Sequence, residues 1–463
     1  MSPDFGAQYA RIYQGTGHYA KAEKFRALTL EKCKQLLGDN HIDTLRAMAA
    51  LAETYLHLAR FEKAKMLLIH ILELQRRILG DDHPETLESM SKLAIIYHCL
   101  GQFENALQVE ILALKKHKQI MGEDHPGTLA NISHLDWENT YSNLEKLEVV
   151  LKLQIVIFQR LTQSLGEDHL DSLQSGNNLA VRYAKRGKLE EAVKLAVSVV
   201  KKHIHVLGQD HPDTLTSIAN LAHIYGLLSN YTEAQDLHMS VFEKRSQILG
   251  KDHPETLRSM ANIAVMYTCL GHFEEALKLQ ILVLEKRRQI VGDDHVDTIN
   301  TMDSLGNIHC HLGQFAAAFK LSLLTVEKRR HIFGEEHPHT LKSMLNLAIA
   351  YGGLGNFEEA KKLQVYILEK QRKTASKDDQ NTLRSKVHLG AMYHHLENIE
   401  EAISLALPAQ QKLIGDLNPW TLLVMGSLAS AYRTSGKIKE AEELDKLFPK
   451  SNTSFKKMNS VIL

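Results

Sequence analysis

Apolar residues recur along the chain with helical spacing, and glycines interrupt them at regular intervals. Within residues 86–121, a first apolar stripe ends at Gly101. Its members are Leu87, Met90, Leu93, Ala94, Tyr97 and Leu100. A second stripe runs from Phe103 to Ile120. Because residues three and four apart share one face of an α-helix, the pattern predicts an antiparallel pair of helices of about 16 and about 18 residues.

The segment that joins one helix pair to the next has a recurrent sequence, close to Leu-Gly-x-Asp-His-Pro-x-Thr-Leu, with a period of 42 residues over most of the chain. Its histidine recurs at His41, His83, His125, His169, His211, His253, His295 and His337, and Asp379 and Asn418 take its place in two degenerate copies. The proline suits the first turn of a helix and the glycine suits the end of the preceding one. Each junction therefore ends one helix pair and begins the next.

A single helix pair cannot bury its own apolar stripe, so the copies must stack on one another. The predicted fold is all-α, a right-handed α-solenoid of about eleven antiparallel helix pairs. The array fills residues 1–447, with a truncated first pair, and residues 448–463 form a polar tail that we expect to be disordered. The small residue after each leucine, such as Ala94, permits close helix packing, and a tyrosine one turn later, such as Tyr97, packs its ring between helices.

The order Leu-Ala-x-x-Tyr, then glycine, then an aromatic residue before Glu-Ala, as in Phe273-Glu274-Glu275-Ala276, resembles the tetratricopeptide repeat. The 42-residue period and the junction are similar to the repeats of kinesin light chains, and to repeat arrays of fungal nucleotide-binding immune-type receptors. The resemblance covers about residues 7–447. It implies a superhelix whose concave groove, lined mainly by the first helix of each pair, binds an extended peptide or a partner protein's segment.

In the related repeats, the residue before the Leu-Ala pair faces the groove and is often asparagine. The matching residues here are Asn178, Asn220, Asn262 and Asn346. An amide both donates and accepts, so such a ladder would hold a peptide backbone; alternatively, these side chains bridge neighbouring helices. The register also places Arg258, Lys342 and Arg384 near the starts of first helices, which favours an acidic partner segment, unless they form a solvated helix face.

Two copies depart from the pattern. In the copy near residues 130–147, Asp136 stands where others have alanine. A carboxylate at a packing position is costly unless it is paired or hydrated, so this copy either opens into a pocket or is a decayed repeat that bends the array. The pocket would be lined by His134, Asp136, Trp137 and Tyr141. The second departure is residues 303–311, with Gly306 in place of alanine and His309 in place of tyrosine.

Composition narrows the functional classes. The chain of 463 residues has 55 Lys and Arg against 55 Asp and Glu, so it lacks the basic excess of a nucleic-acid-binding protein. Four cysteines without a CxxC pair favour a reducing, cytoplasmic compartment, and no apolar stretch reaches membrane-spanning length. The 26 histidines are spread along the array, and we expect those of the junctions to cap helices rather than bind metal.

No nucleotide-binding, GxSxG or HExxH motif occurs, so we expect no catalytic residue, cofactor or metal. The sequence thus favours a noncatalytic scaffold that binds a protein or peptide, without a nucleic-acid or membrane partner. A ligand-sensing region of a receptor is the alternative, followed by a small-molecule pocket or enzyme site in the irregular third repeat. The truncated first pair also suggests self-association through its uncapped face.

Overall fold

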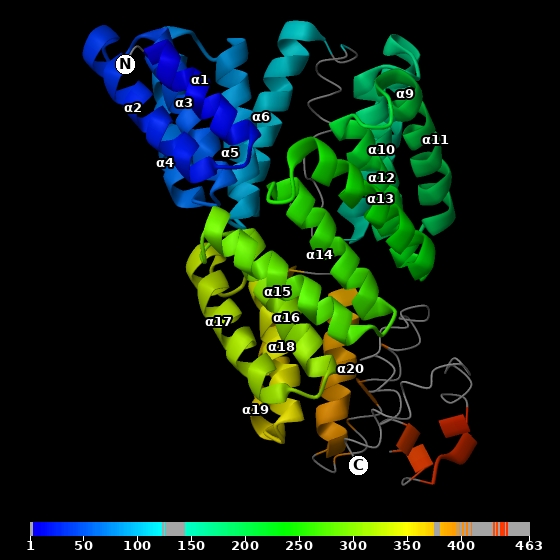
Figure 1. Cartoon of the computed structure of the whole chain (residues 1–463). Coiled ribbons are helices and arrows are strands. Elements are labelled where there is room, and N and C mark those ends of the chain that lie inside the picture. Colours follow the sequence, from blue (N-terminus) through cyan, green and yellow to red (C-terminus); the bar gives the residue numbers. More distant parts are fainter. Residues whose placement is uncertain are drawn as a thin grey trace. The chain divides into compact units, whose positions relative to one another are not determined.

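The computed structural model describes residues 3–122, 144–374 and 380–395, with single residues at 125 and between 398 and 442. Within them it contains 18 helices and no strand, in agreement with the predicted all-α class (Figure 1). The first helices of the pairs are α1 (Pro3–Gly15), α3 (Ile42–His57), α5 (Pro84–Cys99), α10 (Leu170–Lys185), α12 (Pro212–Leu227), α14 (Pro254–Cys269), α16 (Val296–His311), α18 (Pro338–Gly353) and α20 (Gln380–His395). The second helices are α2 (Tyr19–Leu37), α4 (Phe61–Ile78), α6 (Phe103–Met121), α9 (Leu144–Leu165), α11 (Leu189–Leu207), α13 (Tyr231–Leu249), α15 (Phe273–Ile290), α17 (Phe315–Phe333) and α19 (Phe357–Thr374).

These helices confirm the lengths that the apolar spacing predicts. Every described first helix after α1 has 16 residues, and most second helices have 18 or 19. Consecutive helices pack against one another from α1 to α6, from α9 to α12 and from α17 to α20. By their contacts, the residues form two compact units, one comprising 1–227, 236–260 and 283–298, the other 228–235, 261–282 and 299–463.

The junction histidine caps the helix that follows it. At seven junctions, Nδ1 of this histidine accepts a hydrogen bond from the backbone N–H two residues later, over 3.1 to 3.3 Å. The capping role that the repeat predicts is thereby confirmed at these copies. Nδ1 can accept only when it carries no proton, so in this cap a ring proton can lie only on Nε2.

The side chain of the junction threonine bonds the backbone of the same junction. Its hydroxyl donates to the carbonyl of the junction glycine at 2.7 to 2.9 Å in the pairs Thr44–Gly38, Thr86–Gly80, Thr298–Gly292 and Thr340–Gly334. These threonines have no exposed surface. The glycines have φ between +83° and +92°, a left-handed conformation that other residues adopt only with strain. Hydrogen bonds at the helix ends therefore explain the recurrent spacing of the motif.

Two acidic residues of the junction form ion pairs with basic residues of the second helices. The first acid pairs with a basic residue five positions earlier, as in Arg76–Asp81 at 3.1 Å and Arg288–Asp293 at 2.7 Å. The second pairs with a lysine 34 positions later, on the next second helix, as in Lys116–Asp82, Lys244–Asp210 and Lys286–Asp252 at 2.8 to 3.0 Å. Because these groups are largely solvated, each pair contributes little to stability.

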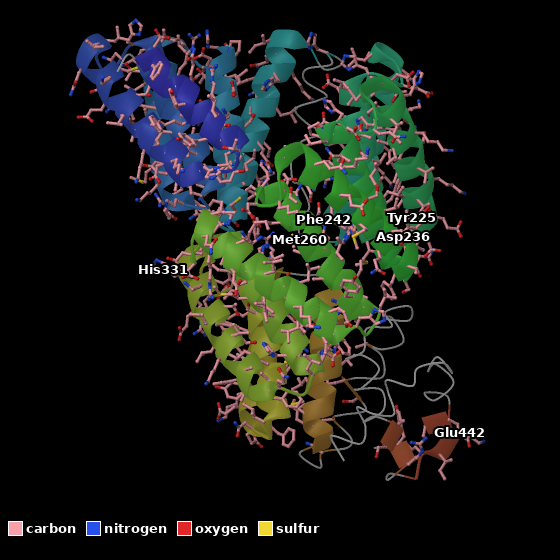
Figure 2. All side chains as sticks on the ribbon, viewed as in Figure 1. Tyr225, Asp236, Phe242, Met260, His331 and Glu442 are labelled. Carbon is pink, nitrogen blue, oxygen red and sulfur yellow. The ribbon has the colours of Figure 1, made fainter. Side chains whose placement is uncertain are left out.

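The alanines that the sequence assigns to close helix packing are buried. Ala52, Ala94, Ala180, Ala222, Ala264 and Ala348 are at most 1% exposed. The tyrosines one turn later are mostly half-buried. Tyr183 and Tyr225 pack against the apolar cluster around Ala184 and Ala196; Tyr225 is labelled in Figure 2. At Gly306, an added Cβ would lie 3.2 Å from the Ser322 hydroxyl, so the loss of alanine there accompanies a close approach of α16 and α17. Among the described helices, none is both long and apolar enough to cross a membrane.

Candidate functional site

The predicted asparagines occupy equivalent positions on four of the five first helices from α10 to α18, and α16 has Ser304 there. Asn178, Asn220, Asn262 and Asn346 lie on α10, α12, α14 and α18, and all four are half-buried. Arg258 on α14 and Lys342 on α18 are exposed, and Arg384 on α20 is half-buried. Each side chain thus keeps surface through which a ligand can reach it. Their role in binding stays a prediction.

Two of the four asparagines have internal hydrogen-bond partners. Asn178 Oδ1 accepts from Gln174 Nε2 at 3.2 Å within α10. Asn346 Nδ2 donates to Asp303 Oδ1 at 3.0 Å, which links α18 to α16. The contact of Asn346 corresponds to the bridging role that the sequence leaves open. It also leaves the other half of the amide for a ligand.

A series of buried arginines, which the sequence analysis did not single out, lies on the second helices beneath this register. Arg245, Arg287 and Arg329 follow one another at the 42-residue period and are 3%, 7% and 2% exposed. Each donates to a backbone carbonyl ten residues later, in the first turn of the following first helix. The distances are 3.3 Å to Glu255, 2.9 Å to Asp297 and 2.8 Å to His339.

Arg245 connects two first helices. Its guanidinium donates to Ser259 Oγ on α14 at 3.0 Å and to Thr216 Oγ1 on α12 at 3.3 Å. The carboxylate of Glu255 lies 3.2 Å away. Burial lowers the pKa of Arg245, and the charge of Glu255 acts in the opposite direction. Since an arginine keeps its charge in a protein, the buried cation is a permanent feature here.

Arg329 makes the most extensive of these contacts. It donates to Asn300 Oδ1 on α16 at 2.8 Å and to Ser343 Oγ on α18 at 2.5 Å, and its Nη1 lies 3.3 Å from Asp303 Oδ2. Asp303 is 5% exposed, and its Oδ1 also accepts from Ser343 Oγ at 3.1 Å. The second irregular segment that the sequence reveals thus begins at a buried ion pair.

The guanidinium groups of Arg245 and Arg329 contact residues at the same repeat position as the predicted basic groove residues. Thr216 and Asn300, which they contact, share the 42-residue column of Arg258 and Lys342. Burial lowers the pKa of Arg287, while Asp297 opposes this shift and the cation of Arg258 adds to it. This part of the first-helix surface is therefore underlain by positive charge. The sequence signal was an arginine in three consecutive copies, each with a serine or threonine 14 residues later.

Histidine clusters do not form a metal site in the part of the chain that the structure describes, where no suitable group of three ligands occurs. In the segment His309 to His311, the His309 ring bonds Gln314 Oε1 at 2.7 Å, Cys310 is buried, and His311 stacks on Phe273 with centroids 4.8 Å apart. Burial lowers the pKa of His311 to about 4 and raises that of Cys310 to about 12. His311 and Cys310 are therefore neutral packing residues near pH 7.

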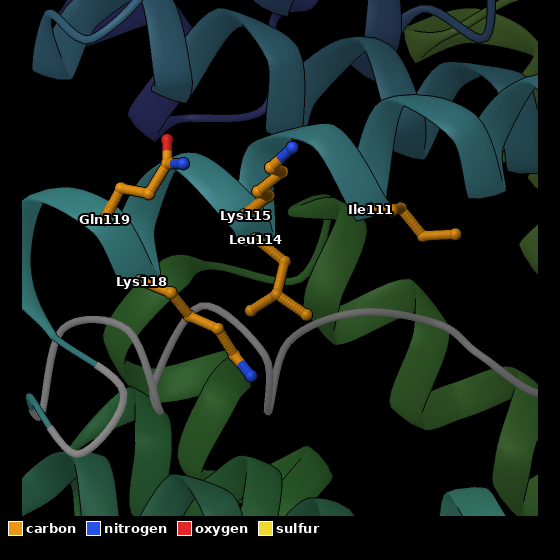
Figure 3. Close-up of a pocket in the computed structure, with 5 residues that line it drawn as sticks. All are labelled: Ile111, Leu114, Lys115, Lys118 and Gln119. Atoms are coloured by element: carbon orange, nitrogen blue, oxygen red, sulfur yellow. The ribbon is translucent and has the colours of Figure 1, made fainter.

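The predicted pocket residues His134, Asp136, Trp137 and Tyr141 lie outside the described residues, so that pocket stays a prediction. A cavity of about 500 Å³ is found elsewhere, against α6 (Figure 3). It is lined by Ile111, Leu114, Lys115, Lys118 and Gln119. These side chains provide neither a nucleophile with an adjacent base nor an acid–base pair, and they suggest no reaction.

The first helix, α1, exposes several apolar side chains. Phe5, Tyr9 and Ile12 on α1 are 46%, 38% and 60% exposed. The residues equivalent to Tyr9 in the next two copies, Leu51 and Leu93, are at most 5% exposed. This contrast is compatible with the predicted self-association, which stays a prediction.

Comparison with protein families identifies the repeat. Models of the tetratricopeptide repeat match residues 6–68, 51–119, 213–285 and 297–364, and a further one matches residues 172–213. No curated protein sequence matches the chain.

Several solved structures are similar. One crystal structure is from Podosopora anserina and is described as kinesin light chain nearly identical TPR-like repeats. It has 30% identity over 44% of this chain and 96% of its own, with a TM-score of 0.37. BtubC (BKLC) from P. vanneervenii has 17% identity over 48% of this chain and 90% of its own, with a TM-score of 0.40. A Rap protein, solved in complex with competence and sporulation factor, has 13% identity over 79% of this chain and 99% of its own, with a TM-score of 0.47.

Tetratricopeptide repeats are in general noncatalytic modules for interaction between proteins, and the contacts around the buried arginines agree with a structural rather than a catalytic use of charge. The family model covers more than half of the chain, and the 42-residue period with its capped junction gives the subtype. The chain belongs to the tetratricopeptide repeat family, and its repeats are of the kinesin light chain type.

Proposed function

We propose that this protein is a noncatalytic scaffold that binds an extended peptide, or such a segment of a partner protein, along its first helices. The observation that carries the proposal is the recurrence of half-buried asparagines at one register position on α10, α12, α14 and α18. An amide can bond a peptide N–H or C=O whatever the peptide's side chains are. A column of such groups therefore suits a backbone of variable sequence.

Charge at the neighbouring register adds a preference. Arg258 and Lys342 are exposed, and Arg245 and Arg329 are buried beneath the same surface. The exposed cations favour carboxylates over ammonium groups in a ligand, whereas the two buried arginines already face Glu255 and Asp303. We therefore expect the bound segment to carry Asp or Glu beside its apolar residues.

The test starts from peptides selected on the wild-type chain from a random-sequence display library. Their dissociation constants are measured by fluorescence anisotropy on a variant with Asn178, Asn220, Asn262 and Asn346 changed to alanine. Loss of several peptide hydrogen bonds of about 1 kcal/mol each should weaken binding at least tenfold. A control variant replaces exposed, uncharged residues of second helices by alanine, namely Ser198, Ser240, Gln247 and Gln289.

The control should bind the selected peptides with wild-type affinity. Equal affinity of the asparagine variant and the control would reject the proposed binding surface. Selected peptides without any excess of Asp and Glu would reject the charge preference while leaving the surface itself supported.

A further inference from the structure

Asp303 places a carboxylate where neighbouring copies have an apolar residue. The equivalent positions one or two periods away are Ala219, Ala261 and Leu345. Asp303 lies on α16 and is 5% exposed, and its two carboxylate oxygens contact different donors. Oδ2 faces Arg329 at 3.3 Å, whereas Oδ1 accepts from Ser343 and Asn346 at 3.1 and 3.0 Å.

This arrangement fixes the orientation of the Asn346 amide. A carboxylate that faces a guanidinium offers only acceptors, so Asn346 must turn its NH₂ group toward Asp303. The carbonyl oxygen of Asn346 then points away from Asp303. Asn346 is half-buried, and its Oδ1 is not among the fully buried polar atoms that lack a partner in the described part of the chain. Because the bond to Asp303 is the one found for Asn346 in the described part of the chain, this oxygen keeps some solvent-accessible surface.

We infer that Asp303 is a positioning residue that makes Asn346 a hydrogen-bond acceptor for a bound peptide. The inference rests on the proposed function, and it specifies that one of the four asparagines accepts a hydrogen bond from the ligand. With its NH₂ held by Asp303, Asn346 presents Oδ1 to an N–H group of the ligand. The residue 43 positions before Asn262, by contrast, is Ala219, so the sequence supplies no equivalent carboxylate there.

The Asp303→Asn variant should reverse this direction without changing the shape of the side chain. Arg329 only donates, so it keeps the oxygen of the new amide on its own side. The new NH₂ then replaces Oδ1 opposite Asn346. Facing a donor, the Asn346 amide turns by 180° and presents its own NH₂ outward. Ser343, as a hydroxyl, can accept as well as donate and adapts to either arrangement.

The first measurement uses the free chain with ¹⁵N-labelled asparagine and follows side-chain NH₂ signals by NMR, assigned with Asn346→Ala. In the wild type, the Asn346 NH₂ should exchange with solvent at least tenfold more slowly than that of Asn262. In Asp303→Asn, its exchange should accelerate at least tenfold, while the Asn262 signal is unchanged. Equal wild-type rates for Asn346 and Asn262 would overturn the inference, even if the variant failed to fold.

The second measurement uses a peptide selected on the wild type and N-methylates its backbone amides one at a time. One methylation should weaken wild-type binding about tenfold, and this loss should disappear in Asn346→Ala and in Asp303→Asn. Persistence of the loss in Asp303→Asn, with slow exchange also unchanged, refutes the positioning role. A set of peptides insensitive to every asparagine substitution, combined with slow Asn346 exchange, instead refutes the proposed function and leaves the orientation established.

Discussion

Replacement of Arg329 by methionine removes a buried cation from the contact between α16, α17 and α18. Arg329 is 2% exposed and donates to Asn300, His339 and Ser343 while it faces Asp303. Methionine fills most of the volume of the arginine stem but makes none of these bonds. Asp303 then remains as a buried carboxylate without its counter-ion. Removal of one partner of such a pair typically costs about 3–5 kcal/mol.

The double variant Arg329→Met with Asp303→Leu tests where this cost arises. Leucine is the residue at the next position of the same column, Leu345, so it suits the local packing. With both charges removed, the free energy of unfolding should recover to within about 2 kcal/mol of the wild type. The two substitutions should therefore be strongly non-additive, and the double variant should be more stable than Arg329→Met alone.

Repeat arrays can unfold in steps, so the assay combines urea unfolding with amide hydrogen exchange of α16–α18. The matched control is Arg330→Met, because Arg330 is the adjacent residue and its partner Glu335, at 2.9 Å, lies in an exposed pair. The control should lose less than about 1 kcal/mol. If Arg329→Met and Arg330→Met destabilised these helices equally, the reasoning about the buried network would be wrong.

Three further predictions concern the histidines and the helix ends. Burial lowers the pKa values of five histidines to about 3 or 4, so unfolding takes up protons below the ordinary pKa of 6.5. For each of these histidines, the chain should lose about 2 kcal/mol of unfolding free energy between pH 7 and pH 5. An unchanged urea midpoint over that interval would contradict this prediction. The five histidines are His238, His311, His337, His339 and His388. Ala59 and Ser229 have φ of +54° and +63° where other copies have glycine, so Ala59→Gly and Ser229→Gly should each stabilise by about 0.5–1 kcal/mol in thermal unfolding, whereas glycine at helical Ala49 should destabilise. Thr340→Val removes the bond from the buried Thr340 hydroxyl to the Gly334 carbonyl and should cost about 1–2 kcal/mol by the same measurement, a loss that Thr232→Val, at an exposed position, should not match.

The sequence predicts the fold closely because the pattern and the packing share one period. The spacing of apolar residues determines helix length, and the junction motif contains the groups that end one helix and cap the next, as at Gly334, His337 and Thr340. Ten imperfect copies of the same local rule leave little freedom in secondary structure. The close agreement therefore follows from local hydrogen bonding.

The candidate site was less predictable, because burial is a tertiary property. Arg329 stands between Lys328 and Arg330, and a run of three basic residues near a helix end normally indicates a solvated face. Only the helices packed above it distinguish Arg329 from Arg330. The sequence did indicate that residues 303–311 are unusual, but it could not show that Asp303 meets an arginine 26 positions later.

The buried arginines have a consequence for how this protein can be rearranged. Arg245 on α13 bonds Ser259 on α14, and Arg329 on α17 bonds Ser343 on α18, so the matched groups belong to adjacent copies of the repeat. Moving a helix hairpin as a cassette would separate each arginine from the serine that it bonds on the following first helix. Each arginine also bonds the preceding first helix, at Thr216 for Arg245 and at Asn300 for Arg329, so the smallest unit that keeps its contacts is a second helix with both flanking first helices. Chimeras and duplications that keep these three helices together should keep their cooperativity, and those spliced at the intervening junction glycines should not.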